Sequence, residues 1–162
     1  MAICKENQVR IIIPTIDTEL SILANKKDMF YEQGIQVLVP DENFITICRD
    51  KRKTIEFFRQ HDIKVPESRD KYHPKFPMFA KPYDGSRSID IHVFHKCEEL
   101  TDDIKTDPKL IFMEYIDTSD YKEYSVDMYY GRDNHVKSIV PRERIEIRAG
   151  EINKGITRKN YL

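Results

Sequence analysis

The sequence predicts a mixed α/β fold, in which a parallel α/β first half is followed by an antiparallel, strand-rich second half. Up to Ile63, apolar runs of strand length alternate with segments of helical periodicity. From Met78 onward the chain is rich in segments of strand length, and only one short helix interrupts them. A charged, proline-containing segment over residues 63–76 is typical of a linker. The predicted domains are therefore residues 1–62 and 77–162, joined by this linker.

The composition is ordinary for a globular protein of one domain or two small lobes. The chain has 162 residues, of which 40% are hydrophobic and 34% charged, with a formal net charge of −1. Without a strong positive excess, no nucleic-acid partner is expected. No apolar run reaches the roughly 18 residues of a transmembrane helix, and no signal-peptide pattern is seen, so no membrane partner is expected either. The three cysteines have irregular spacing that indicates no disulfide framework, and a cytoplasmic location is expected.

Apolar patterns predict the first elements in order. Val9–Pro14 is β-branched and ends at a proline, which predicts a buried strand. The segment 15–34 follows with helical periodicity, an N-cap at Asp17 or Thr18, and a left-handed stop at Gly34. The apolar face of this helix would consist of Leu20, Leu23 and Phe30.

The remaining elements are predicted in the same way. Residues 35–40 predict a second buried strand and residues 41–63 two more helices, which completes the order of a parallel α/β layer. Residues 79–94 predict a strand, a loop of small and polar residues, and a returning strand. Further strands are predicted over residues 109–116, 123–131 and 136–148, with a short helix over residues 97–104.

The tip of the hairpin over residues 79–94 has the composition of an anion site. Gly85, Ser86 and Ser88 would let backbone amides approach an anion, and Lys81 on the entering strand would hold a cation beside it. Polyphosphate binding needs this combination, although the glycine spacing matches neither the P-loop nor the dinucleotide pattern. A purely structural hairpin tip is the alternative.

Two later strands carry charged residues with a two-residue period. The polar face of the first consists of Glu123, Ser125 and Asp127, and its other face, expected in the core, of Tyr124, Val126 and Met128. The second strand places together Arg142, Arg144, Glu146 and Arg148. Such a face either lines a cleft for a charged ligand or is solvated and carries cross-strand ion pairs. His92 and His95 would face opposite sides of a strand, and no metal site is predicted.

Five stretches in this order resemble the ATP-grasp superfamily, in particular the carbamoyl-phosphate-synthase-like proteins with a single ATP-grasp module. They are IIIPTIDTELSILA, CRDKRKTIEFFRQHDIKVPES, FPMFAKPYDGSRSIDIHVF, IFMEYIDTSDYKEYSVDMYY and VPRERIEIRAGEINKGIT. Together they cover nearly the whole chain. The resemblance implies the end of a parallel α/β front lobe, a small central lobe and the antiparallel sheet of a back lobe.

The same resemblance implies a nucleotide site. The residues that match its ATP contacts are Lys51, Lys81, Gly85, Ser86 and Ser88 for the phosphates, Glu114, Tyr115 and Ile116 for adenine, and Glu123 for the ribose. The candidates for catalytic contacts with the terminal phosphate or an acyl substrate are Arg142, Arg144 and Arg148. Family members place magnesium-binding carboxylates and an asparagine further downstream, so ATP is the expected cofactor and Mg²⁺ is expected only for a full-length protein. The 162 residues are accordingly expected to be a truncated piece that is inactive by itself.

ATP-grasp enzymes use ATP to activate a carboxylate as an acyl phosphate, which an amine or thiol then displaces. The resemblance therefore implies the ATP-binding part of a carboxylate-amine ligase-like enzyme, with ATP and an unnamed carboxylate and amine as partners. Two alternatives are a carbamoyl-phosphate synthase subunit acting on bicarbonate, and a non-catalytic nucleotide-binding or interaction module. A homodimer is also compatible with the sequence, because a truncated sheet exposes an unpaired edge and apolar surface.

Overall fold

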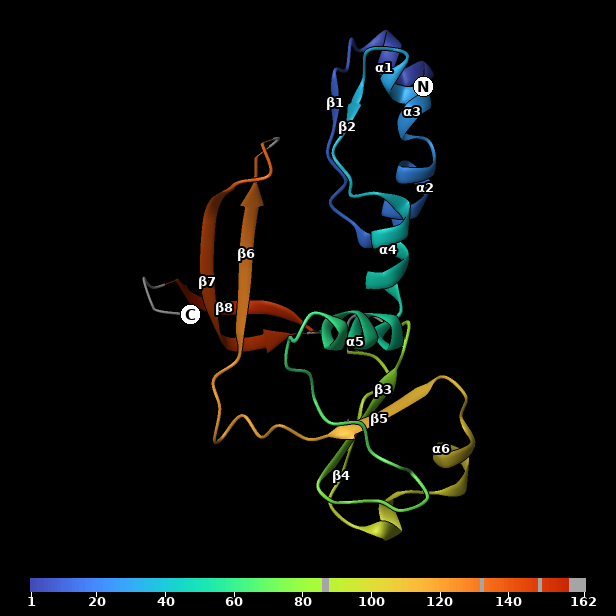
Figure 1. Cartoon of the computed structure of the whole chain (residues 1–162), viewed down its shortest axis with the longest axis vertical. Coiled ribbons are helices and arrows are strands. Elements are labelled where there is room, and N and C mark those ends of the chain that lie inside the picture. Colours follow the sequence, from blue (N-terminus) through green and yellow to red (C-terminus); the bar gives the residue numbers. More distant parts are fainter. Residues whose placement is uncertain (86–87, 132, 149, 158–162) are drawn as a thin grey trace. The chain divides into compact units, whose positions relative to one another are not determined.

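The computed structural model describes residues 1–85, 88–131, 133–148 and 150–157 (Figure 1). Contacts along the chain divide it into two compact units, Met1–Val65 and Pro66–Leu162. The first unit contains a small parallel sheet and the second contains antiparallel sheets, so the predicted mixed α/β fold is confirmed. Within the described ranges, no helix has the length and apolarity needed to cross a bilayer.

The first unit combines two short strands with a series of short helices. Strand β1 (Ile11–Ile12) pairs in parallel with β2 (Gln36–Val37). The helices in chain order are α1 (Ala2–Glu6), the 3-10 helix η1 (Asp17–Glu19), α2 (Leu20–Asn25), α3 (Lys27–Tyr31), α4 (Glu42–Arg49) and α5 (Lys51–Gln60). The two helices predicted over residues 41–63 are thereby confirmed.

The core of the first unit forms where α2 and α3 lie along one side of β1 and β2 (Figure 1). Its buried residues are Phe30, Ile35, Val37, Val39 and Ile45. The predicted burial of both strands is wrong in part, because the helices cover only one face of them. Ile11 and Ile13 are 52% and 66% exposed, and Leu38, between two buried valines, is 46% exposed.

The helix predicted over residues 15–34 is interrupted. Lys26, with φ −104° and ψ 4°, separates α2 from α3. Neither Asp17 nor Thr18 caps α2, whose N-cap is Glu19 without a side-chain hydrogen bond, while Asp17 pairs with Arg49 at 2.8 Å. The predicted apolar face is confirmed, since Leu20 and Leu23 pack against the cluster that contains Phe30. The left-handed stop at Gly34 is also confirmed, with φ +72°.

The second unit contains two three-stranded antiparallel sheets. One has the order β4-β3-β5 and the other β6-β7-β8. The strands are β3 (Met78–Pro82), β4 (His92–Phe94), β5 (Leu110–Glu114), β6 (Tyr124–Tyr130), β7 (Val136–Arg148) and β8 (Glu151–Thr157). Between β4 and β5 lie the 3-10 helix η2 (Cys97–Glu99) and α6 (Asp102–Thr106). The predicted hairpin of β3 and β4 is confirmed by their antiparallel pairing, whereas β8 was not predicted.

Sheet β4-β3-β5 carries the core of the second unit. The buried residues of this core are Met78, Ala80, Phe94 and Phe112 on the strands and Leu100 between β4 and β5. Strand alternation therefore turns Phe79 and Lys81 to the opposite face, where Lys81 pairs in register with Ile111.

Sheet β6-β7-β8 has an apolar face that the sequence placed in the core. Val126 and Met128 are 45% and 55% exposed, and the register sets Met128 opposite Ile139, which is 54% exposed. Their predicted packing into the core is therefore wrong for the described part of the chain. The two-residue period correctly grouped these residues on one face, but it carries no information about what covers that face.

Candidate functional site

Lys81 lies on β3 above an aromatic side chain. Its Nζ is 5.6 Å from the centroid of the Phe79 ring, two residues earlier on the same face. In the neighbouring strand β5, Ile111 and the buried Met113 are the register partners of Lys81 and Phe79. The strand thus presents a half-buried cation over an apolar and aromatic floor, which stabilises the ammonium by a cation–π interaction.

The loop after β3 begins with a tight turn at Gly85. The amide of Gly85 donates to the carbonyl of Pro82 at 3.4 Å, and an added Cβ at Gly85 would lie 3.0 Å from Pro82 Cβ. Glycine therefore permits this close approach. Ser88 adopts φ +55°, which is a left-handed backbone conformation. Ser86, the third predicted loop residue, lies outside the described residues.

Glu114, at the end of β5, is held by an adjoining segment. Its amide donates to the carbonyl of Glu67, and its Oε1 accepts from the amide of Glu67, both at 2.8 Å. Arg69 Nη2 lies 3.9 Å from Glu114 Oε2. The β5 ladder ends at Glu114, and Tyr115 and Ile116 follow, with Ile116 exposed. The carboxylate of Glu114 is thus used to fix the strand end, while the two residues after it leave the sheet.

A connected group of predicted site residues surrounds Arg144 on β7. Its Nε lies 3.0 Å from Glu123 Oε1, its Nη1 donates to Ser125 Oγ at 3.2 Å, and its Nη2 donates to the carbonyl of Gly150 at 2.8 Å. The amide of Arg144 also donates to the carbonyl of Glu123 at 2.8 Å. Only 16% of the Arg144 side chain is exposed, against 46% of the Glu123 side chain.

The predicted sharing of one face by polar residues of two strands is confirmed for Arg142 and Arg144. Arg142 Nε lies 3.0 Å from Asp127 Oδ2, beside the pair of Arg144 and Glu123. Of the two predicted descriptions of this face, the cross-strand ion pairs are therefore present. Beyond Arg144 the pairing of β7 with β8 shifts twice, so the two-residue period no longer groups later residues with Arg144.

The later charged residues of β7 accordingly have other partners. Glu146 Oε2 lies 2.8 Å from Lys154 Nζ on β8, and Asn153 donates to Glu146 Oε1. The hydrogen bond from Lys154, followed by that from Asn153, holds the pKa of Glu146 below its usual range. Arg148 is exposed at the end of β7, in register with Glu151.

A pocket of about 380 Å³ lies where the segment before β6 meets β7. Glu123 and Arg144 contribute to its lining, together with Tyr121, Lys122 and Glu143. Lys122 Nζ lies 3.0 Å from Glu143 Oε1, so two ion pairs border the pocket. Among the residues that the structure describes, no three His, Cys, Asp or Glu side chains form a group that could hold a metal ion.

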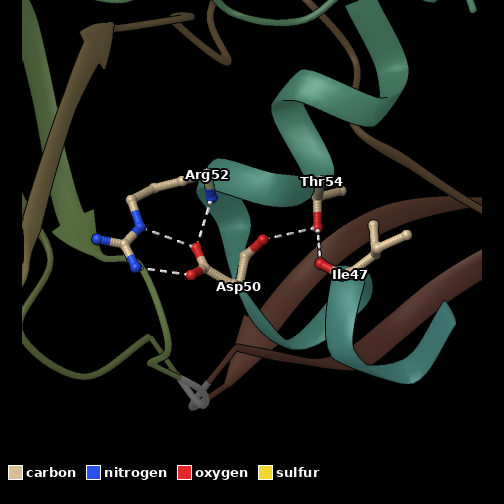
Figure 2. A network of polar contacts seen from close by, with 4 residues as sticks. All are labelled: Ile47, Asp50, Arg52 and Thr54. Atoms are coloured by element: carbon tan, nitrogen blue, oxygen red, sulfur yellow. Dashed lines mark hydrogen bonds and ion pairs between the residues drawn. The ribbon is translucent and has the colours of Figure 1, made fainter. Parts of the chain in front are cut away.

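Lys51, the predicted site residue of the first unit, opens α5, and Figure 2 shows the polar contacts of Asp50, Arg52 and Thr54 around the start of this helix. The preceding residue, Asp50, is the N-cap, and its Oδ1 accepts from the amide of Arg52 at 2.9 Å. Asp50 Oδ2 also pairs with Arg52 Nη2 at 2.7 Å. Thr54 Oγ1 donates to the carbonyls of Ile47 and Asp50 at 2.9 and 3.1 Å, which ties the end of α4 to the start of α5. The backbone around Lys51 is therefore firmly held.

The predicted residues lie in three places. Arg142 and Arg144 lie on sheet β6-β7-β8, with Glu123 directly before β6. Lys81 and Glu114 lie on sheet β4-β3-β5, and Lys51 lies in the first unit. Sequence reasoning missed the role of Gly150. Because β8 was not predicted, no pattern indicated that the residue before it would accept a hydrogen bond from Arg144.

The sequence matches two families. Residues 48–160 match the ATP-grasp domain, and residues 1–38 match the PylC-like N-terminal domain. No curated protein sequence matches the chain.

The fold is similar to several solved structures. The biotin carboxylase of Campylobacter jejuni matches over 93% of this chain and 38% of its own, with a TM-score of 0.70 and 12% identity. The biotin carboxylase domain of the Hydrogenobacter thermophilus 2-oxoglutarate carboxylase matches over the same shares, with a TM-score of 0.65 and 16% identity. The N5-carboxyaminoimidazole ribonucleotide synthetase of Thermotoga maritima matches over 83% of this chain and 36% of its own, with a TM-score of 0.58 and 17% identity.

The chain therefore spans less than half the length of each of these proteins. At such identities the likeness concerns the fold. The family is given by the sequence match over residues 48–160, which covers more than half of the 162 residues. This chain belongs to the ATP-grasp family.

Proposed function

We propose that this chain is the ATP-binding part of an ATP-grasp carboxylate-amine ligase, similar to carbamoyl-phosphate-synthase-like proteins, that activates a carboxylate as an acyl phosphate. The observation that carries the proposal is the Glu123 carboxylate, which Arg144 holds at a pocket beside the start of β6. Similar folds support a nucleotide ligand: the C. jejuni biotin carboxylase was solved as a complex with β-γ-ATP, and the H. thermophilus domain with MgADP.

In this proposal Glu123 binds the ribose. An ionised carboxylate accepts hydrogen bonds at both oxygens, which suits two neighbouring hydroxyl groups. Arg144 approaches only Oε1 among the contacts described for it, and a carboxylate has about four acceptor positions in all. The Glu123 carboxylate therefore has more acceptor positions than the contact with Arg144 occupies.

Adenine would be read by the backbone of Tyr115 and Ile116. The carboxylate of Glu114 supports this assignment indirectly, because it is engaged with the amide of Glu67 and fixes the end of β5. The residues directly after a fixed strand end are well placed to offer amide and carbonyl groups to a base edge. Glu114 then fixes the position of Tyr115 and Ile116.

Lys81 would bind the phosphates, and Gly85, Ser86 and Ser88 would form the covering loop. Lys51, which the family resemblance matches to a phosphate contact, is a separate prediction. Phosphoryl transfer depends mainly on positioning and on neutralising charge that moves onto the phosphoryl oxygens, and lysine and arginine side chains supply such charge. Arg142, Arg144 and Arg148 are the candidates for contacts with the terminal phosphate or the acyl substrate.

Equilibrium binding of ATP and of inorganic tripolyphosphate tests the proposal, because only ATP contains a ribose. Hydrogen bonds to a charged group contribute about 1.5–3 kcal/mol, so Glu123→Ala should weaken ATP binding by roughly 10- to 150-fold. The affinity for tripolyphosphate should change little.

Asp127→Ala is the matched control, since Asp127 lies on the same face of β6 and also pairs with an arginine, but has no proposed ligand contact. It should leave both affinities nearly unchanged. Equal losses of ATP and tripolyphosphate affinity in Glu123→Ala would show that Glu123 supports the fold, and the ribose assignment would be lost. A wild-type chain that binds neither ligand would rule out the nucleotide site itself.

A further inference from the structure

The Arg144 side chain already contacts protein oxygens, which distinguishes it from an arginine whose guanidinium is open to a phosphate. A guanidinium has five N–H donors in a planar fork. Arg144 Nη1 and Nη2 donate to Ser125 Oγ and to the carbonyl of Gly150, and Nε lies 3.0 Å from Glu123 Oε1 in an ion pair that lacks hydrogen-bond geometry. A phosphate that bound this half-buried guanidinium would compete with these contacts to the protein.

The three partners come from separate stretches of the chain. Glu123 precedes β6, Ser125 lies on β6, and Gly150 precedes β8. The backbone strengthens the link, because the amide of Arg144 donates to the carbonyl of Glu123 and extends the pairing of β6 and β7 by one residue. Arg144 therefore fixes Glu123 through both its main chain and its side chain.

A second ion pair fixes the register at this point. Lys122 pairs with Glu143 at 3.0 Å, directly beside the pair of Glu123 and Arg144. The charges run plus, minus along residues 122–123 and minus, plus along residues 143–144. A shift that set Glu123 against Glu143 would bring like charges together, and like charges directly opposite each other destabilise a strand pair. The position of the Glu123 carboxylate is thus strongly specified.

We infer that Arg144 is a positioning residue for the nucleotide site, and does not bind the phosphates: it orients the Glu123 carboxylate toward the ribose and ties it to the backbone at the start of β8. This inference rests on the proposed function and changes the role of Arg144 within it. The same side chain joins Glu123 to the carbonyl of Gly150, two residues beyond Arg148. Ribose recognition and the end of β7 that carries Arg148 are therefore connected by one guanidinium.

The substitution Arg144→Gln tests the inference, because glutamine removes the charge and cannot reach three partners in this geometry. ATP affinity should fall by about tenfold or more, approaching the loss in Glu123→Ala, since the carboxylate would no longer be oriented. Affinity for tripolyphosphate should stay within about twofold of wild type, a difference of only about 0.4 kcal/mol. The double variant Glu123→Ala/Arg144→Gln should lose no more ATP affinity than Glu123→Ala alone, because Arg144 would act through Glu123.

Two further measurements separate positioning from a general loss of structure. Glu146→Gln is the control variant, since it breaks the ion pair of Glu146 with Lys154 between β7 and β8 and should leave both affinities unchanged. Amide hydrogen exchange at Gly150 and Glu151, measured without nucleotide, should speed up in Arg144→Gln and stay as in wild type in Glu123→Ala.

Two results would overturn the positioning role of Arg144. Equal losses of ATP and tripolyphosphate affinity in Arg144→Gln, or additive losses in the double variant, would overturn the positioning role and return Arg144 to direct phosphate contact or to general support of the fold. If only the positioning role is wrong, wild-type protein should still bind ATP more tightly than tripolyphosphate. If wild-type protein shows no such preference, the proposed ribose site fails first, and the positioning role toward ribose fails with it.

Discussion

At the scale of single residues, two lysines of the second unit have similar surroundings and different expected roles. Lys81 Nζ lies 5.6 Å from the Phe79 ring centroid, and Lys71 Nζ lies 5.5 Å from Tyr72 and 5.7 Å from Phe112. Both therefore gain from a cation–π interaction, which is about 0.5–1 kcal/mol at exposed sites. Only Lys81 lies on the strand that leads into the proposed phosphate loop. Substituting each lysine in turn therefore separates the loss of a ligand contact from the loss of a cation–π interaction.

Lys81→Met should weaken ATP and tripolyphosphate alike, by about tenfold or more for each, because both ligands carry the phosphates that the ammonium would contact. This pattern differs from the ATP-selective loss expected for Glu123→Ala. Lys71→Met, measured in the same titrations, should leave both affinities nearly unchanged. A similar loss in both lysine variants would mean that the net positive charge, and not the position of Lys81, attracts the ligands.

At the scale of elements, α5 depends on its first residues. Asp50 accepts from the amide of Arg52, one of the helix-initial amides that have no partner within the helix. Its second oxygen holds the guanidinium of Arg52, so one carboxylate both caps the helix and forms an ion pair (Figure 2). Because Lys51 lies between these two residues, the cap also sets the backbone from which Lys51 projects.

Asp50→Ala should lower the free energy of unfolding of the first unit by about 0.5–2 kcal/mol, the range for loss of an N-cap. Urea unfolding followed by helical circular dichroism measures this change. Arg52→Ala keeps the cap and loses an ion pair whose arginine is 54% exposed, so its effect should be at most about 1 kcal/mol. If Arg52→Ala proves the more damaging of the two, the ion pair and not the cap stabilises α5.

The carboxyl of Asp50 also predicts a pH dependence. The side-chain hydrogen bond from Arg52 is the largest cause that lowers the pKa of Asp50 below 3.8. A lowered folded-state pKa means that the stabilisation is fully present above the unfolded-state pKa and is lost as pH falls through the folded-state value. Asn also caps helices well, so Asp50→Asn isolates the charge. Thermal unfolding should show wild type more stable than Asp50→Asn at neutral pH, with the difference vanishing in strong acid; a constant difference would exclude the ionised form as its source.

Local patterns predicted most elements, and the misses have physical causes. Apolar runs of strand length identified β3 and β5, and two-residue periodicity identified β6 and β7. It did not identify β8, whose EINKGIT sequence contains a glycine and is ordered by its pairing with β7. The candidate site shows the same limit of local patterns. The two-residue period predicted that Arg144 shares a face with the polar residues of β6, whereas its hydrogen bond to Gly150 depends on β8, which no pattern predicted.

At the scale of the whole molecule, two cores stabilise the chain. The buried cluster of the first unit includes Ile35, and that of the second includes Met78. The clusters share no residue, and the chain divides between Val65 and Pro66. Since hydrophobic burial is the dominant stabilising contribution in folding, each unit has its own source of stability.

A core substitution should therefore act mainly on its own unit. Ile35→Ala and Met78→Ala each remove a side chain that is at most 3% exposed, and each should destabilise by about 2–5 kcal/mol. Hydrogen exchange read by mass spectrometry should show Ile35→Ala speeding exchange in α3 and α4 while β3 and β5 keep their protection, and Met78→Ala the reverse. The two variants are controls for each other, since they remove similar apolar volumes from different clusters. If either one speeds exchange equally in both units, the chain unfolds as a single cooperative body, and the separation of the two cores does not govern its stability.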